Sequence, residues 1–214
     1  EAVIPWGAGT RMHIGNPPNR YDIAVDLGNL NRIIEYEPGD LTIVVEAGLV
    51  ISDLQAHVAR YGQRLAYDPP MPTLATIGGS LASNAVGPMI TSFGGVRDMT
   101  IGLRVVEADG VITKSGGRVV KNVQGLDLVR LHIGAFGTLA VIAEIAFKLF
   151  PIPMHNQTVV AWFDSLDWAK EASMQLFNGR FVPEYITMIT GQTARDLSND
   201  LGANFDATDD VYLL

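Results

Sequence analysis

Glycine-rich bends are the features of this sequence whose residue types and spacing are best suited to chemistry. They occupy residues 7–11, 76–79, 93–98 and 134–139, each beside an expected strand. Glycine has no Cβ, so the backbone N–H groups of such a bend can contact a ligand directly, and the chain there can adopt positive φ. A single bend is normally a tight turn. Several bends from distant parts of the chain predict peptide amides that converge on an extended ligand carrying phosphates.

The bend at residues 76–79 is the most informative of the four. Prolines at positions 69, 70 and 72 precede it, and a run of small residues follows it as far as Ala85. A thin surface of this kind, leading into an expected helix N-terminus, suits a diphosphate because donors converge there and side chains stay out of the way. A tight turn in a strand-rich domain is the alternative, and this segment alone leaves both interpretations open.

The first bend invites a different interpretation. Gly7 and Gly9 follow an expected strand, and Asp26 lies about twenty residues further on, as in the dinucleotide fingerprint of a Rossmann βαβ unit. The third glycine of that fingerprint is replaced by Met12, and the prolines at positions 17 and 18 exclude the helix that must follow. A nicotinamide-binding Rossmann domain is therefore the disfavoured alternative.

The composition excludes several other functions. The 214 residues are 48% hydrophobic and 18% charged, which predicts a folded chain with a substantial core. The net charge of -8 argues against a nucleic-acid partner, because phosphate-backbone binding needs clustered Lys and Arg. The absence of cysteine excludes disulfides and thiolate catalysis, and the four histidines have no metal-ligand spacing, so we expect no metal site.

No targeting or membrane signal is evident in the sequence. No apolar run reaches the roughly 20 residues that span a bilayer, so we expect no transmembrane segment. No basic region followed by an apolar stretch opens the chain, and we expect a cytoplasmic protein. The chain begins without Met inside an expected strand, which leads us to expect a fragment.

The hydrophobic pattern predicts a strand-rich first part and a β-α-β-like second part, separated near Pro151 and Pro153. In the first part we expect strands at 2–5, 23–27, 41–47, 99–108, 111–114 and 139–150, a helix at 53–61 capped by Ser52, a hairpin turn at Asp109-Gly110 and a helical turn or two at 126–133. In the second part we expect a strand at 158–163, a helix at 166–177 capped by Ser165, a strand or helix start at 183–190 and a helix at 193–201.

The order of the motifs resembles the PCMH-type FAD-binding domain of the vanillyl-alcohol oxidase superfamily. Residues 5–11 are similar to its Pro-x-Gly-Gly-Gly-Thr-Ser loop, and residues 76–87 to its second flavin segment. Residues 94–103, 121–128 and 134–142 are similar to three further elements, in the family's order. The resemblance covers about residues 3–151. Within the superfamily the chain most resembles the FAD-binding subunit of bacterial glycolate oxidase, mainly through residues 116–122.

The resemblance implies an α+β fold with two domains. Residues 1–151 would form the FAD-binding domain: a small, mostly parallel sheet subdomain that lacks its first βαβ unit, and a larger antiparallel or mixed sheet subdomain with helices. Residues 152–214 would form the truncated start of an α+β cap domain that contacts substrate.

The resemblance also implies a cofactor site. The cofactor would be FAD, bound non-covalently, because no His or Cys lies between Trp6 and Met12 to form a covalent link. Two departures from the family pattern, Ala8 and Ala140, each add a methyl group where backbone approaches the ligand. Leu126 replaces a usual Tyr. The cofactor-binding residues implied are Gly7, Ala8, Gly9, Thr10, Arg11, Pro70, Thr76, Gly78, Gly79, Ser83, Asn84, Gly137, Val141 and Ile142.

The activity implied is oxidation of a small 2-hydroxy acid, such as glycolate, to the 2-oxo acid, with hydride transfer to the flavin. No residue stands out as the catalytic acid or base. Other subunits of an oxidase complex are the expected partners, and any association with the inner membrane would be peripheral and through them. The alternative is a non-catalytic accessory subunit that keeps the FAD-binding fold.

Overall fold

The computed structural model describes residues 1–117, 128–163, 165–180, 182–200 and 212–213. The motif at 121–128 therefore lies outside the described residues, apart from Leu128. Contacts divide the chain into two compact units. Unit 1 comprises Glu1–Gly87 and Phe93–Ile152, and unit 2 comprises Pro88–Ser92 and Pro153–Leu214. The domain roles inferred from the sequence for 1–151 and 152–214 stay predictions.

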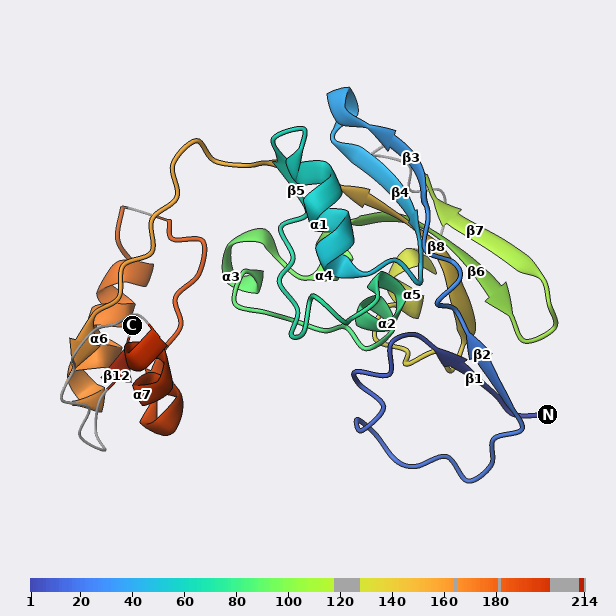
Figure 1. Ribbon diagram of the computed structural model, residues 1–214, viewed down its shortest axis with the longest axis horizontal. Helices are drawn as coiled ribbons and strands as arrows, with labels where there is room; N and C mark the ends of the chain where they lie inside the picture. The colour runs from blue at the N-terminus through green and yellow to red at the C-terminus, as the bar shows by residue number, and fades with distance from the viewer. Residues whose placement is uncertain (118–127, 164, 181, 201–211, 214) are drawn as a thin grey trace. The chain divides into compact units, whose positions relative to one another are not determined.

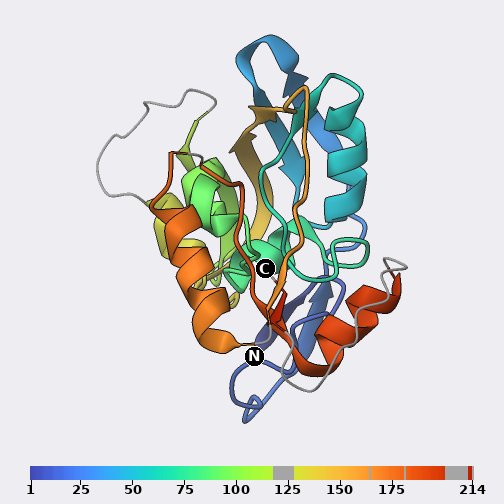
Figure 2. The same ribbon diagram turned by 90° about the vertical axis from the view of Figure 1, so that its left-hand side faces the viewer.

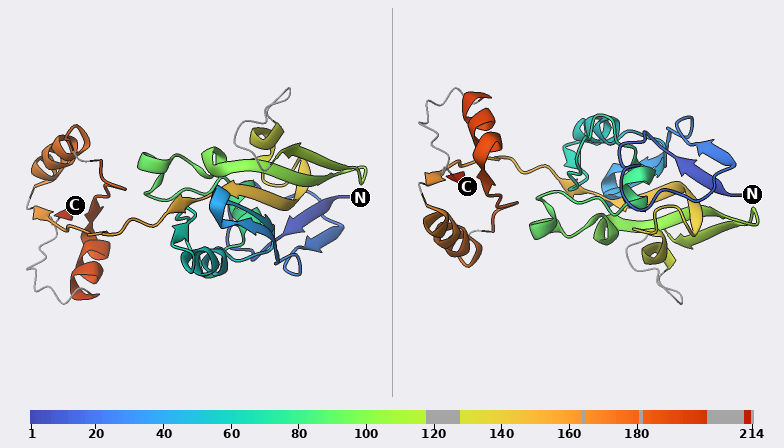
Figure 3. Two further views of the ribbon diagram at one scale, coloured as in Figure 1. Left: turned by 90° about the horizontal axis from the view of Figure 1, so that it is seen from above. Right: turned by 90° about the horizontal axis from the view of Figure 1, so that it is seen from below.

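Unit 1 begins with a small parallel sheet. Strand β1 (Val3–Trp6) pairs with β2 (Ile23–Asp26), and Val3 lies opposite Ile23. Figures 1 and 3 show the two strands side by side at the end of unit 1 that carries the N-terminus. Both strands lie where the sequence placed them to within a residue.

The main sheet of unit 1 is antiparallel and has the strand order β3-β4-β8-β6-β7. Its strands are β3 (Ile33–Glu37), β4 (Thr42–Glu46), β8 (Ala140–Lys148), β6 (Thr100–Glu107) and β7 (Ile112–Gly116). Strand β8, the last of them in sequence, lies in the middle and pairs with both β4 and β6. The predicted hairpin turn joins β6 to β7, with Gly110 at φ +86. An antiparallel main sheet beside a parallel pair confirms the α+β class and is unlike a doubly wound Rossmann domain.

Strand β3 was not expected from the sequence. Its residues Glu35 and Glu37 carry charge on a strand at the edge of the sheet. An edge strand has one unpaired side and tolerates charged residues, so its hydrophobic pattern is weak.

Four helices of unit 1 contribute buried residues to one apolar core with the strands. They are α1 (Ile51–Ala59), α2 (Ile77–Ala82), α4 (Val96–Met99) and α5 (Leu128–His132), with a 3-10 turn at Pro38–Asp40 and the short α3 (Ile90–Phe93) elsewhere. Leu54 and Val58, one helical turn apart on α1, are fully buried. Figure 2 shows α1 beside strands β3 and β4, where the rings of His57 and Tyr36 are 5.5 Å apart.

The predicted N-cap of α1 is wrong. Ser52 lies inside the first turn, and the N-cap residue is Val50. Val50 forms a β-bridge with Thr76, and the amide of Ile51 donates to the carbonyl of Ala75 at 3.1 Å. These bonds hold the chain extended up to Val50, so tertiary pairing rather than a capping side chain sets the start of the helix.

From Pro153 onward, the described residues of unit 2 form a small antiparallel sheet in the order β10-β12-β11 and the helices α6 and α7. Its elements are β10 (Trp162–Phe163), α6 (Leu166–Phe177), β11 (Ile189–Thr190), α7 (Gly191–Asp200) and β12 (Tyr212–Leu213). Helix α6 has the predicted bounds with Ser165 at the N-cap, whereas the strand expected at 158–163 is reduced to β10. Throughout the part of the chain that the structure describes, no helix is both long and apolar enough to cross a membrane.

Gly48 joins the parallel pair of unit 1 to its antiparallel sheet. Its amide donates to the carbonyl of Leu30 at 2.7 Å. A Cβ at this position would overlap the carbonyl oxygen of Leu27 and lie 2.8 Å from that of Leu30. The segment after β2 therefore packs directly on the backbone at the end of β4, and only glycine allows it.

We predict that Gly48→Ala destabilises the protein by about 3 kcal/mol, because the new methyl group must push backbone away from backbone. The measurement is the free energy of unfolding by urea denaturation. Gly39→Ala is the matched control: its Cβ would meet only Glu37 Oε1, at 3.6 Å, so its stability should stay within about 0.5 kcal/mol of wild type. Equal losses for the two variants would contradict the assigned role.

An ion pair between Arg32 and Glu46 also connects the segment after β2 to the end of β4. The buried Glu46 carboxylate accepts a hydrogen bond from the Arg32 amide at 2.8 Å and one from its guanidinium at 2.7 Å. These bonds hold the pKa of Glu46 below its ordinary value, against the opposing effect of burial. The Arg32 side chain is 76% exposed, so solvent screening keeps the contribution of the pair modest.

We predict that Glu46→Gln costs about 1 kcal/mol of stability at pH 7. A lowered folded-state pKa stabilises the protein above the unfolded pKa, near 4.3, and that stability is lost as pH falls through the folded value. The difference between wild type and variant should therefore shrink as the pH is lowered from 7 toward 3 in a series of urea titrations. Arg32→Gln should show the same trend, and a difference that is constant with pH would refute the ion-pair interpretation.

Candidate functional site

Three of the four glycine-rich bends line one groove in unit 1, which we call the glycine groove. The end of β1 contributes Pro5 and Trp6, and the first bend contributes Gly7. The start of α2 contributes Thr76, Gly78 and Gly79, and the last bend contributes residues 136–137. The wall is completed by Leu27, Ala47, Ala82, Ala140 and Ile142. Segments from across unit 1 therefore meet at this place.

The absence of side chains lets these segments approach one another. A Cβ on Gly7 would overlap Thr76 Oγ1, and a Cβ on Gly78 would lie 2.6 Å from the Cβ of Ala47. A Cβ on Gly137, which has φ +72, would lie 3.0 Å from the ring of Pro5. Each contact joins two different segments of the groove wall, so the glycines first of all serve close packing.

The amides of the first bend are available to a ligand. Among the described residues, the backbone N–H groups of residues 7–11 donate to no acceptor, and the amide of Gly137 likewise has none. Gly9 has φ +70, so the backbone turns sharply within this run. Successive unpaired amides on a curved backbone suit an anion such as a diphosphate.

The amides of the second bend serve a different purpose from the one expected. The sequence suggested that Gly78 and Gly79 donate to a ligand. In the structure Gly78 donates to the Ala47 carbonyl at 2.7 Å, and Gly79 donates to Thr76 Oγ1 at 3.3 Å, which caps α2. Both glycines line the glycine groove, but their donors are used in fixing α2 to the end of β4.

The third bend does not line the glycine groove. Its Phe93 packs edge-on against Phe150 of β9 (Phe150–Pro151), with ring centroids 5.2 Å apart, and the guanidinium of Arg64 on β5 (Gln63–Arg64) lies over the Phe93 ring. This cluster follows the end of β8, whereas the groove lies at that strand's start. Nine residues of strand separate the two ends, roughly 30 Å at 3.3 Å per residue.

The other expected cofactor-binding residues lie around the groove without lining it. Ala8, Gly9 and Thr10 belong to the first bend, and their amides donate to no acceptor among the described residues. The Ser83 hydroxyl donates to the Gly79 carbonyl at 2.8 Å, within α2. Asn84, at φ +45, lies against Gly134 of the last bend.

Three further expected residues lie away from the groove wall. The Arg11 charge acts on the buried Tyr67, whose pKa is raised by burial and lowered in part by Ser80 and Arg11. Pro70 is exposed in the segment before α2. Val141 pairs with Val106, on the opposite face of the sheet from its neighbour Ile142.

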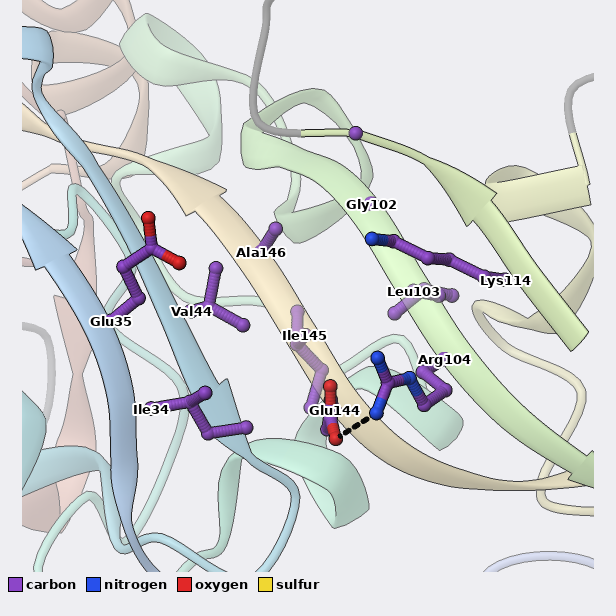
Figure 4. A pocket seen from close by; sticks show the side chains of 11 residues that line it. Ile34, Glu35, Val44, Gly102, Leu103, Arg104, Lys114, Glu144, Ile145 and Ala146 are labelled. Atoms are coloured by element: carbon purple, nitrogen blue, oxygen red, sulfur yellow. Dashed lines mark hydrogen bonds and ion pairs between the residues drawn. The ribbon is translucent and has the colours of Figure 1, made fainter. Parts of the chain in front are cut away.

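That opposite face holds a second hollow, which has different chemistry. Figure 4 shows side chains from all five strands around it, with Arg104 of β6 donating to Glu144 of β8 at 2.7 Å. Val44 and Ala146 contribute apolar surface. None of the four glycine-rich bends lines this hollow, so it is separate from the glycine groove.

Two aromatic residues of the glycine groove were missed from the sequence. Trp6 and Phe136 line it and are 40% and 50% exposed. Trp6 directly precedes Gly7, and Phe136 lies between Gly134 and Gly137, so both occupy variable positions of motifs that carried the resemblance. Their signal in the sequence was their type: large apolar residues in or beside glycine-rich bends are unusual where only a turn is needed.

Comparisons with known proteins agree with this geometry. The family model described as FAD binding domain matches residues 1–116, more than half of the chain. The chain belongs to the FAD binding domain family. The resemblance to the PCMH-type domain stated from the sequence is thereby confirmed, and FAD is the cofactor of the fold.

Relatives and solved structures extend the match beyond the FAD binding domain. The chain is 31% identical to "Glycolate oxidase subunit GlcD" of Bacillus subtilis (strain 168), over 89% of this chain and 41% of the relative. It is 34% identical to "Glycolate oxidase subunit GlcE" of Escherichia coli (strain K12), over 71% of this chain and 43% of the relative. A structure of alkyldihydroxyacetonephosphate synthase has the same fold over 99% of this chain and 41% of its own, with a TM-score of 0.76 and 20% identity. The chain thus spans about two fifths of its curated relatives.

The residues present fit FAD. The diphosphate needs several donors and no bulky side chains, which the first bend provides through its unpaired amides and its glycines. The remainder of the wall is apolar, as a ring system requires. Residues 7–11 and Gly137 would hold the cofactor through backbone, and α2 would set the position of the groove wall.

We predict that Gly78→Ala weakens FAD binding at least about tenfold, because the new methyl group meets Ala47 and displaces the start of α2. The measurement is titration of the apoprotein with FAD. The double variant Gly78→Ala/Ala47→Gly removes the methyl group that is struck and should recover part of the affinity. No recovery would show that the Ala47 contact is not the cause.

Proposed function

We propose that the chain is the cofactor-binding part of an FAD-dependent oxidoreductase that oxidises a 2-hydroxy acid, such as glycolate, to the 2-oxo acid. The observation that carries this proposal is the glycine groove, whose unpaired amides in the first bend suit the diphosphate of FAD. The 2-hydroxy acid is suggested by the relatives, which bear the names glycolate oxidase subunit and "D-lactate dehydrogenase".

FAD, when bound, accepts two electrons as a hydride, a reaction that no amino-acid side chain performs. The chain's own contribution is to bind and orient the cofactor. Among the described residues that line the groove none has a titratable side chain, so the groove itself moves no proton. The base that removes the substrate's hydroxyl proton must therefore lie elsewhere in the protein.

A non-catalytic accessory subunit remains the second candidate, favoured by the same lack of a base and by one substitution. Ala140, where the family has glycine, is buried in the groove wall and narrows it by a methyl group. Both candidates agree with relatives named as subunits, and we propose that the protein works with other subunits of an oxidase complex. A cytoplasmic position, reaching the inner membrane only through those partners, belongs to the same proposal.

We predict that the full-length protein releases FAD on denaturation and, with its partner subunits, reduces a dye acceptor when given glycolate or D-lactate. Chromatography of the released flavin and the bleaching of dichlorophenolindophenol are the two measurements. Succinate, a carboxylic acid without a hydroxyl group, is the control substrate and should give no bleaching.

The two readouts separate the candidates. Bound FAD together with turnover supports the oxidoreductase. The accessory role predicts a different result for the Gly78→Ala variant. Where the wild-type protein binds FAD, the complex still turns over substrate when it contains a variant that has lost its flavin. The absence of flavin from the wild-type protein would refute the oxidoreductase and leave only the accessory role.

A further inference from the structure

Trp6 and Phe136 are the features of the glycine groove that diphosphate binding does not explain. Trp6 ends β1 and Phe136 lies in the last bend, 130 positions further along the sequence, and they line the same groove with 40% and 50% of their surfaces exposed. A diphosphate needs donors and gains nothing from a large apolar ring. Half-exposed aromatic residues facing a ligand groove instead suit stacking against a flat ring.

Trp6 lies directly beside the amides of the first bend. A Cβ on Gly9 would lie 2.8 Å from Cζ2 of the Trp6 indole, so the ring packs on the backbone of that bend. Gly9 has φ +70, and the turn it makes leaves the space that the indole occupies. A ligand that placed its diphosphate on these amides would therefore have an indole next to it.

Phe136 is held in a strained conformation. Its φ is +53, in the left-handed region that bulky residues seldom adopt, and its amide donates to the Ala82 carbonyl of α2 at 2.8 Å. Two glycines of the same bend, Gly134 and Gly137, also have positive φ but lack a Cβ and bear no such strain. A glycine at position 136 would relieve the strain, so the benzyl group is retained in the groove at a cost to folding.

We propose that Trp6 and Phe136 stack against a planar ring of the cofactor and so favour a ring-bearing dinucleotide over a bare diphosphate. This inference rests on the proposed cofactor-binding role of the groove. The ring is either the adenine or the isoalloxazine of FAD, which share the flat, polarisable surface that an aromatic side chain recognises. Both residues are specificity-determining, and neither takes part in the chemistry.

The test uses Trp6→Leu and Phe136→Leu, which keep apolar bulk but remove the ring. Each should weaken FAD binding to the full-length apoprotein about tenfold in a calorimetric titration, whereas Trp6→Phe and Phe136→Tyr should stay within about threefold of wild type. Trp168→Leu and Phe177→Leu are the matched controls. These residues, on α6 of unit 2, are more exposed than Trp6 and Phe136 and do not line the glycine groove, so their substitution should leave the affinity unchanged.

Titration with fragments identifies the ring. If the adenine is stacked, the leucine variants should lose affinity for ADP and keep that for FMN, and if the isoalloxazine is stacked the reverse should hold. Loss for either fragment supports the proposal. Loss for neither, or equal losses in the unit 2 controls, would overturn it.

Phe136→Gly separates the ring from the fold. It removes the strain along with the ring, so its melting temperature should equal or exceed that of wild type while its affinity for FAD falls. A fall in melting temperature with unchanged affinity would show that Phe136 is structural, against the proposal. All these readouts measure binding or melting, so they do not depend on turnover. If the wild-type protein binds FAD but oxidises no substrate, only the proposed oxidoreductase function is refuted. If it binds no FAD, the stacking role of Trp6 and Phe136 is refuted as well.

Discussion

The close approach of chain segments at three glycines is the constraint on which unit 1 depends. Gly48 lies against the carbonyl of Leu27, Gly78 against Ala47, and Gly7 against the hydroxyl of Thr76. Each contact is too tight for a Cβ, so the small parallel sheet, the antiparallel sheet and α2 meet at distances that only glycine permits. The groove lies at the edge of the apolar core, and the buried Ala47, Ala140 and Ile142 belong to both.

This constraint divides the work among the bends. The amides of Gly78 and Gly79 in α2 donate to Ala47 and Thr76. These bonds fix the helix in place and leave its N-terminal end few donors for a ligand. The amides of residues 7–11 have no acceptor among the described residues, because the loop after β1 leaves the sheet before its donors are paired. A rigid wall opposite an unpaired donor run is a preorganised anion site, since the protein need not reorganise to bind.

Much of the fold could be predicted from the sequence, where local pattern decides the structure. The hairpin at Gly110 and the bounds of α6 follow from turn chemistry and hydrophobic spacing. The edge strand β3 could not be predicted, because its pairing with β4 depends on a partner rather than on its own charged residues. The start of α1 was misplaced for a related reason: the bridge from Val50 to Thr76 overrides the capping preference of Ser52.

The site was predictable in outline but not in its division of roles. Glycine spacing shows where backbone can approach something, yet it does not say whether that something is a ligand or another strand. Gly78 and Gly7 carry the same sequence signal. In the fold the Gly78 amide donates to the Ala47 carbonyl, whereas the Gly7 amide has no acceptor among the described residues and is available to a ligand. The third bend has the same signal again, and its place beside Phe150, at the far end of β8, depends on strand order.

The electrostatics of the groove follow from its construction out of backbone. The chain has a net charge of -8, and the described residues of the groove wall include no cationic side chain to offset the charge of a diphosphate. Arg11 of the first bend, whose charge acts on Tyr67, does not line the wall, so attraction at the wall comes from peptide dipoles, which act only over short distances and need the ligand to fit closely. A site of this kind gains little from long-range electrostatic attraction of the ligand, so its affinity depends on direct contacts with the bound ligand. Apolar ring surface beside the amides therefore matters more here than in a site built from Lys or Arg, and the exposed faces of Trp6 and Phe136 are the ring surface that the groove offers.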